Sequence, residues 1–249
     1  MEERGKAYSL DLGGYEVRYA FEDPDTYKIF GKYIREAEGS TYDIRVTREY
    51  MEKCRWLVTE DTEDDYLEFQ SLMEATAIRL LSVNRALFHG VSFLWKGKAW
   101  IITAPSGTGK TTQYRHWRSM LRKEIQIISG DKSVITCRDD GKVIVSSSPW
   151  RGKERMGVPF KSRELGGIIL LEQGNRNEIR RMSSQEAVYP LFIEFISIPE
   201  NEEQIRKQGD LLRQILENTP VWKLVNKGDS DSALLTQKTL TDYLEEGHE

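Results

Sequence analysis

Apolar and polar positions alternate through much of the first sixty residues, the pattern of half-buried β-strands. Residues 8–12 and 15–21 alternate on either side of Gly13-Gly14, which predicts a β-hairpin with a glycine turn. Residues 42–46 alternate once more and predict a further strand. The N-terminal region is therefore expected to be rich in β-structure.

The apolar period changes to that of a helix after Asp64, which is a candidate N-cap. The pattern predicts an amphipathic helix over residues 65–82. Its apolar stripe is interpreted as core and not as a partner-binding face, because a lone helix must bury such a stripe. The stripe consists of Tyr66, Phe69, Met73, Ala77 and Leu80.

Strands and helices alternate from about residue 86 onward, which indicates an α/β fold. Strands are expected over 87–95, 99–103, 125–128, 133–137, 142–147, 166–171 and 221–225. Helices are expected over 110–122, 184–197, 203–217 and 229–246, the second opening with Ser183 and Glu186 at capping-box spacing. The change of pattern divides the chain into a β-rich region with one helix over 1–85 and an α/β region over 86–249.

Composition and charge argue against several classes of protein. The 249 residues contain 36 Lys and Arg against 40 Asp and Glu, so a nucleic-acid-binding surface is not expected. The densest apolar run, 165–171, is too short to cross a membrane, and the charged start shows no secretory signal. Only two cysteines occur, without metal-site spacing, which favours a cytoplasmic protein without structural zinc.

The most specific motif is the segment 104–111, Ala-Pro-Ser-Gly-Thr-Gly-Lys-Thr, a Walker A loop with Ala in place of the first Gly. Its glycines allow backbone N–H groups to surround a phosphate, and the following helix directs its N-terminal donors at the same anion. Lys110 is expected to contact the β- and γ-phosphates, and Thr111 to offer its hydroxyl to Mg²⁺. The alternative, an incidental glycine-rich turn, does not explain the strand before the loop and the helix after it. The predicted nucleotide-binding residues are Ser106, Gly107, Thr108, Gly109, Lys110, Thr111 and Thr112.

Two further residues are candidates for chemistry. Asp131 follows the strand over 125–128, where a P-loop protein places a carboxylate for Mg²⁺, although a turn aspartate is the alternative. His89 lies on the strand that leads toward the P-loop and is either a packed structural histidine or a catalytic one. Asp139 and Asp140 are interpreted as turn formers.

These motifs occur in an order that resembles one family. Phe88-His89-Gly90, the P-loop, Gly130-Asp131-Lys132 and the segment 148–153 resemble the HPr serine kinase/phosphatase catalytic domain and its relatives. That group is similar to ATP-type phosphoenolpyruvate carboxykinases and includes kinases that phosphorylate a serine on lasso-peptide precursors. The resemblance covers roughly residues 86–225 and implies a P-loop kinase core of this type behind the β-rich N-terminal region.

The resemblance also implies roles for individual residues. His89 matches a histidine that flanks the reacting phosphate, and Asp131 matches one of two aspartates that bind metal and act as general base. Gly130 stands where the other aspartate is expected. Three alternatives follow: one carboxylate serves both tasks, the general base lies elsewhere, or turnover is weak. Arg151 or Lys153 is either a cation for the transferring phosphoryl group or part of a solvated loop.

The expected function is therefore that of an ATP- and Mg²⁺-dependent kinase acting on a serine hydroxyl of a small protein or peptide. In this hypothesis His89, Asp131, Lys110 and Arg151 are catalytic, and Thr111 and Asp131 hold the metal. A nucleotide-binding regulatory or assembly protein with weak catalysis is one alternative, and a carboxykinase-like enzyme of small metabolites is another. The kinase relatives are often oligomeric, so the resemblance implies self-association.

Overall fold

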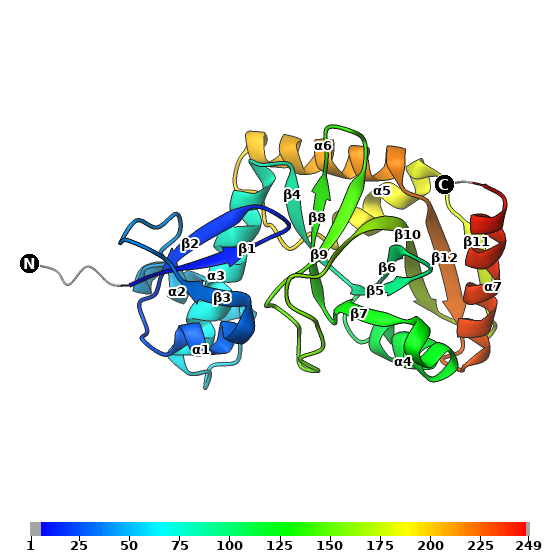
Figure 1. Ribbon diagram of the computed structural model, residues 1–249, viewed down its shortest axis with the longest axis horizontal. Helices are drawn as coiled ribbons and strands as arrows, with labels where there is room; N and C mark the ends of the chain where they lie inside the picture. Colours follow the sequence, from blue (N-terminus) through cyan, green and yellow to red (C-terminus); the bar gives the residue numbers. More distant parts are fainter. Residues whose placement is uncertain (1–5, 248–249) are drawn as a thin grey trace, which may run out of the picture.

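The N-terminal region begins with a three-stranded sheet, in a computed structural model that describes residues 6–247 (Figure 1). β1 (Ala7–Asp11) and β2 (Glu16–Ala20) are antiparallel, with Leu10 opposite Val17. The predicted hairpin is therefore confirmed. Its turn needs glycine, because Gly13 and Gly14 adopt φ angles of 68° and 81°. β3 (Ile34–Glu36) pairs with the other edge of β1.

The strand predicted over 42–46 is wrong. This segment forms only one bridge, between Tyr19 and Ile44, although the side chains of Ile44 and Val46 are buried. The segment lies beside β2, at the edge of the sheet opposite β3. Two short helices, α1 (Thr26–Phe30) and α2 (Arg48–Lys53), interrupt a region in which the sequence predicted strands alone.

The predicted amphipathic helix is present as α3 (Asp64–Leu81). Glu63 occupies the N-cap position and Asp64 the first helical position, one residue from the prediction. Phe69, Met73, Ala77 and Leu80 are buried, as expected of a core stripe, whereas Tyr66 at the first turn is exposed. The helix lies against the N-terminal sheet and α1.

The second half of the chain contains a nine-stranded mixed sheet, and it confirms the predicted α/β class. Its order is β4-β8-β9-β10-β6-β5-β7, with β12 and β11 continuing from β10. The long strand β10 joins an antiparallel part, β4-β8-β9, to a part in which β6, β10 and β12 are parallel. The strands are β4 (Arg85–His89), β5 (Val91–Trp95), β6 (Lys98–Thr103), β7 (Gln126–Ser129), β8 (Lys132–Cys137), β9 (Val143–Ser147), β10 (Ser162–Gln173), β11 (Glu178–Arg181) and β12 (Val221–Asn226).

The single strand predicted over 87–95 is two strands that separate at Gly90. β4 pairs with β8, whereas β5 pairs with β6 and β7. A Cβ at Gly90 would lie 2.7 Å from Ile101 Cγ2 and 2.9 Å from the Ile102 carbonyl oxygen. The chain therefore crosses from one part of the sheet to the other at a residue without a side chain.

Helices cover both faces of the parallel part of the sheet (Figure 1). Alternate residues of β6 point to opposite layers of helices. Ile101 packs toward α5 (Ser184–Phe192) and α6 (Glu202–Asn218). Trp100 packs toward α4 (Lys110–Leu121) and α7 (Asp231–Glu245). The capping box predicted at Ser183 and Glu186 is present at the start of α5. Within residues 6–247 no helix combines the length and the apolar character needed to cross a bilayer.

A hydrophobic cluster joins the N-terminal region to the large sheet. Leu10 and Leu12 of the hairpin belong to the same buried cluster as Leu87 of β4, Val134 of β8 and Trp150. The indole Nε1 of Trp150 donates a hydrogen bond of 3.1 Å to the Phe69 carbonyl oxygen of α3. The residues before and after position 85 thus share one hydrophobic core at this junction.

Candidate active site

The Walker A segment connects the end of β6 to the start of α4, as its sequence predicted. Gly107 and Gly109 have φ angles of 82° and 108°, a left-handed region that glycine adopts without strain. A Cβ at either position would meet no other atom within 4 Å, so the glycines are required by backbone conformation and not by crowding. Ser106, Gly107 and Thr112 are exposed, and Thr111 is half-buried at the first turn of α4. Thr108 closes the loop by donating from its hydroxyl to the Pro105 carbonyl oxygen at 2.8 Å.

Lys110 is a buried cation beneath this loop. The residue is only 8% exposed. Its Nζ donates hydrogen bonds of 2.7 Å and 3.3 Å to the carbonyl oxygens of Ala104 and Pro105. Burial lowers the pKa of Lys110, and the charges of Glu194 and Asp131 oppose that effect. The loop lysine therefore lies within the electrostatic field of two carboxylates.

His89 lies between those two carboxylates. Its Nδ1 is 2.7 Å from Oε2 of Glu194, and its Nε2 is 3.4 Å from Oδ1 of Asp131. Backbone bonds fix the three segments, since His89 N–H donates to the Glu194 carbonyl oxygen and Gly90 N–H donates to that of Asp131. Burial works to lower the pKa of His89, but the hydrogen bonds with Asp131 and Glu194 outweigh burial and raise it. The arrangement stabilises the imidazolium form.

Asp131 is held in its ionised form. Burial works to raise the pKa of Asp131, but the hydrogen bond with His89 and the charge of Lys132 outweigh it and lower the pKa to about 2. Lys132 Nζ forms an ion pair with Asp131 Oδ2. The carboxylate is therefore charged at neutral pH and lies between His89 and the cation Lys132.

The neighbouring position, Gly130, has no room for a side chain. A Cβ there would lie 2.9 Å from Met156 Cβ and 3.0 Å from the Met156 carbonyl oxygen, to which Gly130 N–H donates a hydrogen bond of 2.9 Å. The segment that follows β9 thus packs directly against the site expected for a second aspartate. Asp131 is the carboxylate that this turn can present.

Arg151 is placed differently from the other predicted catalytic residues. Its guanidinium lies 5.3 Å from the centroid of the Tyr33 ring, and Nη1 donates to the Arg155 carbonyl oxygen at 3.4 Å. Within residues 6–247 no hydrogen bond or ion pair joins Arg151 to the P-loop, His89 or Asp131. Lys153 is exposed on the same segment. The structure brings His89, Lys110 and Asp131 together, whereas the guanidinium of Arg151 contacts Tyr33 of the N-terminal region.

The residues present have the chemistry to hold a nucleotide phosphate with Mg²⁺. Left-handed glycines, the N-terminus of a twelve-residue helix and Lys110 supply donors and positive charge for phosphate oxygens. The Thr111 hydroxyl and the ionised Asp131 carboxylate are oxygen ligands of the kind that Mg²⁺ prefers. In the described part of the chain no three His, Cys, Asp or Glu side chains converge as a metal cluster, and magnesium held jointly by protein and phosphate oxygens does not need one.

Glu194 is the site residue that the sequence analysis missed. It lies just past the end of α5 and is 3% exposed, in a segment where Phe195 bridges Phe88 of β4. The signal in the sequence is weak but visible, because a lone carboxylate stands in the otherwise apolar run 191–196. A buried charge of this kind requires a partner, and the partner is His89.

No protein-family model matches the chain. No curated protein matches its sequence. Among the solved structures that match is the HPr(Ser) kinase/phosphatase from Coxiella burnetii, at 11% sequence identity and a TM-score of 0.39, over 64% of this chain and 91% of that one.

Proposed function

We propose that this protein is a P-loop kinase that transfers a phosphoryl group from Mg²⁺-bound ATP to a serine hydroxyl on a small protein or peptide. The observation on which the proposal rests is the position of His89, between the carboxylates of Glu194 and Asp131 and within the field of Lys110. A nucleotide-binding loop beside an oriented histidine and an ionised aspartate is suited to phosphoryl transfer. The choice of serine rests on the resemblance of the ordered sequence motifs.

Phosphate binding falls to the P-loop. Lys110 and the N–H groups at the start of α4 would hold the phosphates, and Thr111 with Asp131 would hold the metal. When bound, Mg²⁺-ATP supplies the phosphoryl group and a divalent charge that neutralises its oxygens. The Lys110 side chain already lies beneath the loop, where its Nζ donates a hydrogen bond to the Ala104 carbonyl oxygen. Its positive charge is therefore in place next to the loop that would bind the phosphates.

Asp131 would accept a hydrogen bond from the acceptor hydroxyl and orient it. A carboxylate with a pKa of about 2 is a weak base, but the loose transition state of phosphoryl transfer demands orientation more than base strength. His89 would fix the carboxylate, with Nδ1–H donating to Glu194 and Nε2–H directed at Asp131. Glu194 is then a positioning residue that determines which ring nitrogen faces Asp131.

A second candidate function is a nucleotide-binding regulatory protein with weak catalysis. Gly130 favours it, because the backbone of the segment 151–156 leaves no space for a second carboxylate at that turn. The two candidates share the nucleotide site and differ in whether a phosphoryl group is transferred.

Transfer of ³²P from γ-labelled ATP to a serine-containing peptide library tests the proposal. We expect labelled peptide with the wild type, and a loss on the order of 100-fold or more with Lys110→Met and with Asp131→Asn. Lys123→Met, an exposed lysine beyond α4, is the matched control and should transfer normally. Calorimetry with Mg²⁺-ATP separates the remaining cases: binding without transfer supports the regulatory function, and absence of binding would contradict both.

A further inference from the structure

Lys132 is a second lysine at the candidate active site, and the proposed function has so far given it no task. It is the first residue of β8 and lies directly opposite His89 of β4 in the antiparallel pair. Opposite residues of such a pair carry their side chains on the same face of the sheet, about 5 Å apart at Cβ. The lysine is thus beside both the histidine and the carboxylate at which the acceptor hydroxyl is expected.

The backbone of Lys132 is fixed, whereas its ammonium group has donors to spare. The Lys132 carbonyl oxygen accepts hydrogen bonds from the hydroxyl groups of Ser129 and Ser148, at 2.5 Å and 2.7 Å. Within residues 6–247 the hydrogen-bond partner of Nζ is Asp131 Oδ2 alone. An ammonium group has three N–H donors, and this side chain is 17% exposed, so further donors can reach a ligand in the site.

Lys132 also interacts electrostatically with the lysine of the P-loop. Burial is the main cause of the lowered pKa of Lys110, and the positive charge of Lys132 adds to that effect. Two cations close enough to repel each other are stabilised by an anion that both can contact. The terminal phosphate of a nucleotide bound at the P-loop is such an anion.

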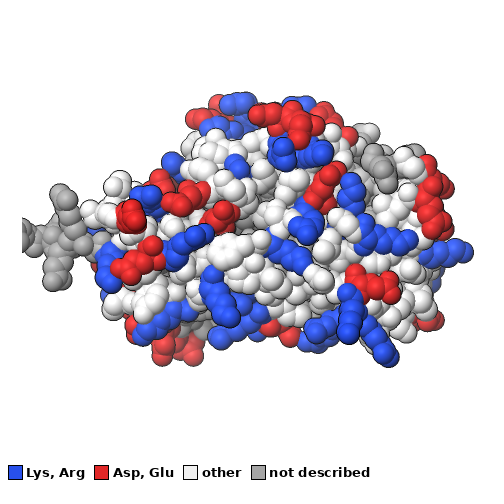
Figure 2. Space-filling model, viewed as in Figure 1, with Lys and Arg blue, Asp and Glu red and all other residues white. Residues whose placement is uncertain are grey.

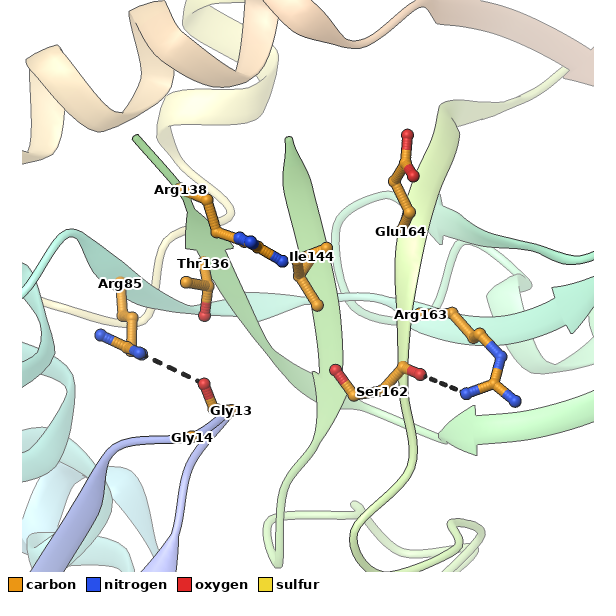
Figure 3. Close-up of a pocket in the computed structure, with 9 residues that line it drawn as sticks. All are labelled: Gly13, Gly14, Arg85, Thr136, Arg138, Ile144, Ser162, Arg163 and Glu164. Atoms are coloured by element: carbon orange, nitrogen blue, oxygen red, sulfur yellow. Dashed lines mark hydrogen bonds between the residues drawn. The ribbon is translucent and has the colours of Figure 1, made fainter. Parts of the chain in front are cut away.

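The arginines near these strands are directed elsewhere. Figure 2 shows Lys and Arg side chains spread over the visible face with acidic side chains between them, so surface charge does not mark the site. Figure 3 shows Arg85 of β4 directed at the hairpin turn, where it donates to the Gly13 carbonyl oxygen at 3.2 Å. Arg138, which follows β8, pairs with Asp140 at 3.1 Å. Of the lysines and arginines on or next to β4 and β8, Lys132 is the one in contact with the site.

We propose that Lys132 is a further catalytic residue, whose ammonium group holds Asp131 and at the same time donates hydrogen bonds to the γ-phosphoryl group of the bound nucleotide. This inference rests on the proposed kinase function, in which the phosphoryl group passes from a nucleotide at Lys110 to a hydroxyl at Asp131. A hydroxyl that is hydrogen-bonded to Asp131 lies next to Lys132 Nζ, and the phosphorus that it attacks is only about 3 Å further.

The charge of Lys132 would act during the transfer itself. The serine oxygen forms a bond to the γ-phosphorus while the bond from phosphorus to the β–γ bridging oxygen breaks, and that oxygen leaves with ADP. The serine proton passes through the Asp131 carboxylate to water. Lys132 keeps its protons and neutralises charge on the phosphoryl oxygens, the task that the sequence analysis expected of Arg151.

Calorimetry of the full chain with Mg²⁺-ADP and with Mg²⁺-AMPPNP, a non-hydrolysable analogue that has the γ-phosphate, tests this contact. Lys132→Gln keeps a donor for Asp131 and removes the charge. We expect it to bind Mg²⁺-ADP as the wild type does and Mg²⁺-AMPPNP about 10-fold or more weakly, as for the loss of a charge-assisted hydrogen bond. Lys132→Arg keeps the charge and should restore most of the affinity. Lys98→Gln is the matched control, because Lys98 is also a strand lysine paired with a carboxylate, Glu164 at 3.1 Å, and should bind both nucleotides normally.

The ³²P transfer assay separates this inference from the kinase function. A loss of affinity confined to AMPPNP, with transfer slower on the order of 100-fold, supports Lys132 as a catalytic residue. Equal loss for both nucleotides, or no loss for either, would overturn it and leave Lys132 a structural partner of Asp131. A wild type that binds AMPPNP but transfers no phosphate would contradict the kinase function, while a loss confined to AMPPNP would still place Lys132 at the γ-phosphate. Circular dichroism excludes unfolding as the cause of a loss, and Lys132→Met replaces Lys132→Gln if the latter does not fold.

Discussion

Gly152 lies directly against the carboxylate of Asp131. A Cβ at Gly152 would stand 2.8 Å from Asp131 Cβ, 2.9 Å from its Cγ and 3.0 Å from Oδ2. The segment after β9 therefore packs against the carboxylate near Oδ2, whereas His89 lies near Oδ1. The position of Asp131 depends on a residue without a side chain, twenty-one positions later in the chain.

Gly152→Ala is expected to displace the Asp131 carboxylate and lower phosphoryl transfer by about 10-fold or more. Gly152 also has a φ of 66°, so alanine adds strain of roughly 1–2 kcal/mol. Gly39→Ala is the matched control, because Gly39 has a φ of 80° with no neighbour within 4 Å of its Cβ position. Both variants should lose stability through the positive φ, Gly152→Ala more because of the crowding, and only Gly152→Ala should lose activity. Equal activities would contradict the crowding at Asp131.

Glu194→Gln is expected to lower the pKa of His89 and to slow transfer. The amide keeps the size of the side chain but removes the charge that favours the imidazolium. NMR titration of the histidine ring, assigned by comparison with His89→Gln, measures the first effect. A slower reaction with an unchanged His89 titration would show that Glu194 has a structural role alone.

The stability of the protein should depend on pH through His89 and Asp131 in opposite directions. The pKa of His89 is raised above its ordinary value of 6.5, so its contribution is complete below 6.5 and is lost as pH rises through the folded pKa. The pKa of Asp131 is lowered to about 2, so its contribution is present above 3.8 and is lost as pH falls toward 2. Urea unfolding of the wild type should show declining stability above pH 6.5, with a flatter profile in His89→Gln. An equally steep decline of stability in His89→Gln would show that other titratable groups cause it.

Arg151→Met is expected to reduce stability by about 1 kcal/mol, the value of a cation–π contact, and to leave Mg²⁺-ATP affinity unchanged. The structure places the guanidinium on the Tyr33 ring, and among the described residues no hydrogen bond or ion pair joins it to the P-loop. Thermal unfolding and calorimetry measure the two effects, with the exposed Lys153→Met as the control. A loss of transfer on the order of 100-fold at normal stability would instead place Arg151 on the transferring phosphoryl group.

The parts of the site that the sequence predicted are those determined by local chemistry. The strand, glycine loop and helix around Lys110 are contiguous, and Asp131 directly follows a short apolar strand. The capping box at Ser183 and the hairpin turn at Gly13-Gly14 are likewise contained in a few adjacent residues. Backbone preferences within such segments do not require knowledge of the rest of the fold.

The features that the sequence did not predict depend on distant contacts. Glu194 lies 105 positions from His89, and only the packing of the segment after α5 on β4 brings them together. The break at Gly90 is hidden because the mainly apolar residues before and after it have the pattern of one strand. Its cause is the approach of Ile101 and Ile102 from β6. The failed strand over 42–46 has the right alternation, and Ile44 does lie beside Tyr19 of β2, but the contact there is limited to one bridge. The third strand of the sheet, β3, instead pairs with β1 at the opposite edge.

The hydrophobic cluster that unites the hairpin with β4 and β8 has a consequence for how the molecule opens. A fragment that begins at residue 86 would leave Leu87 and Val134 without the apolar surface of Leu10 and Leu12 that covers them. Opening of the hairpin and opening of the strand that holds His89 should therefore belong to one cooperative unit. Native-state hydrogen exchange is expected to give the amides of β1 and β4 a common opening free energy. The strand that carries His89 would then open whenever the N-terminal hairpin opens.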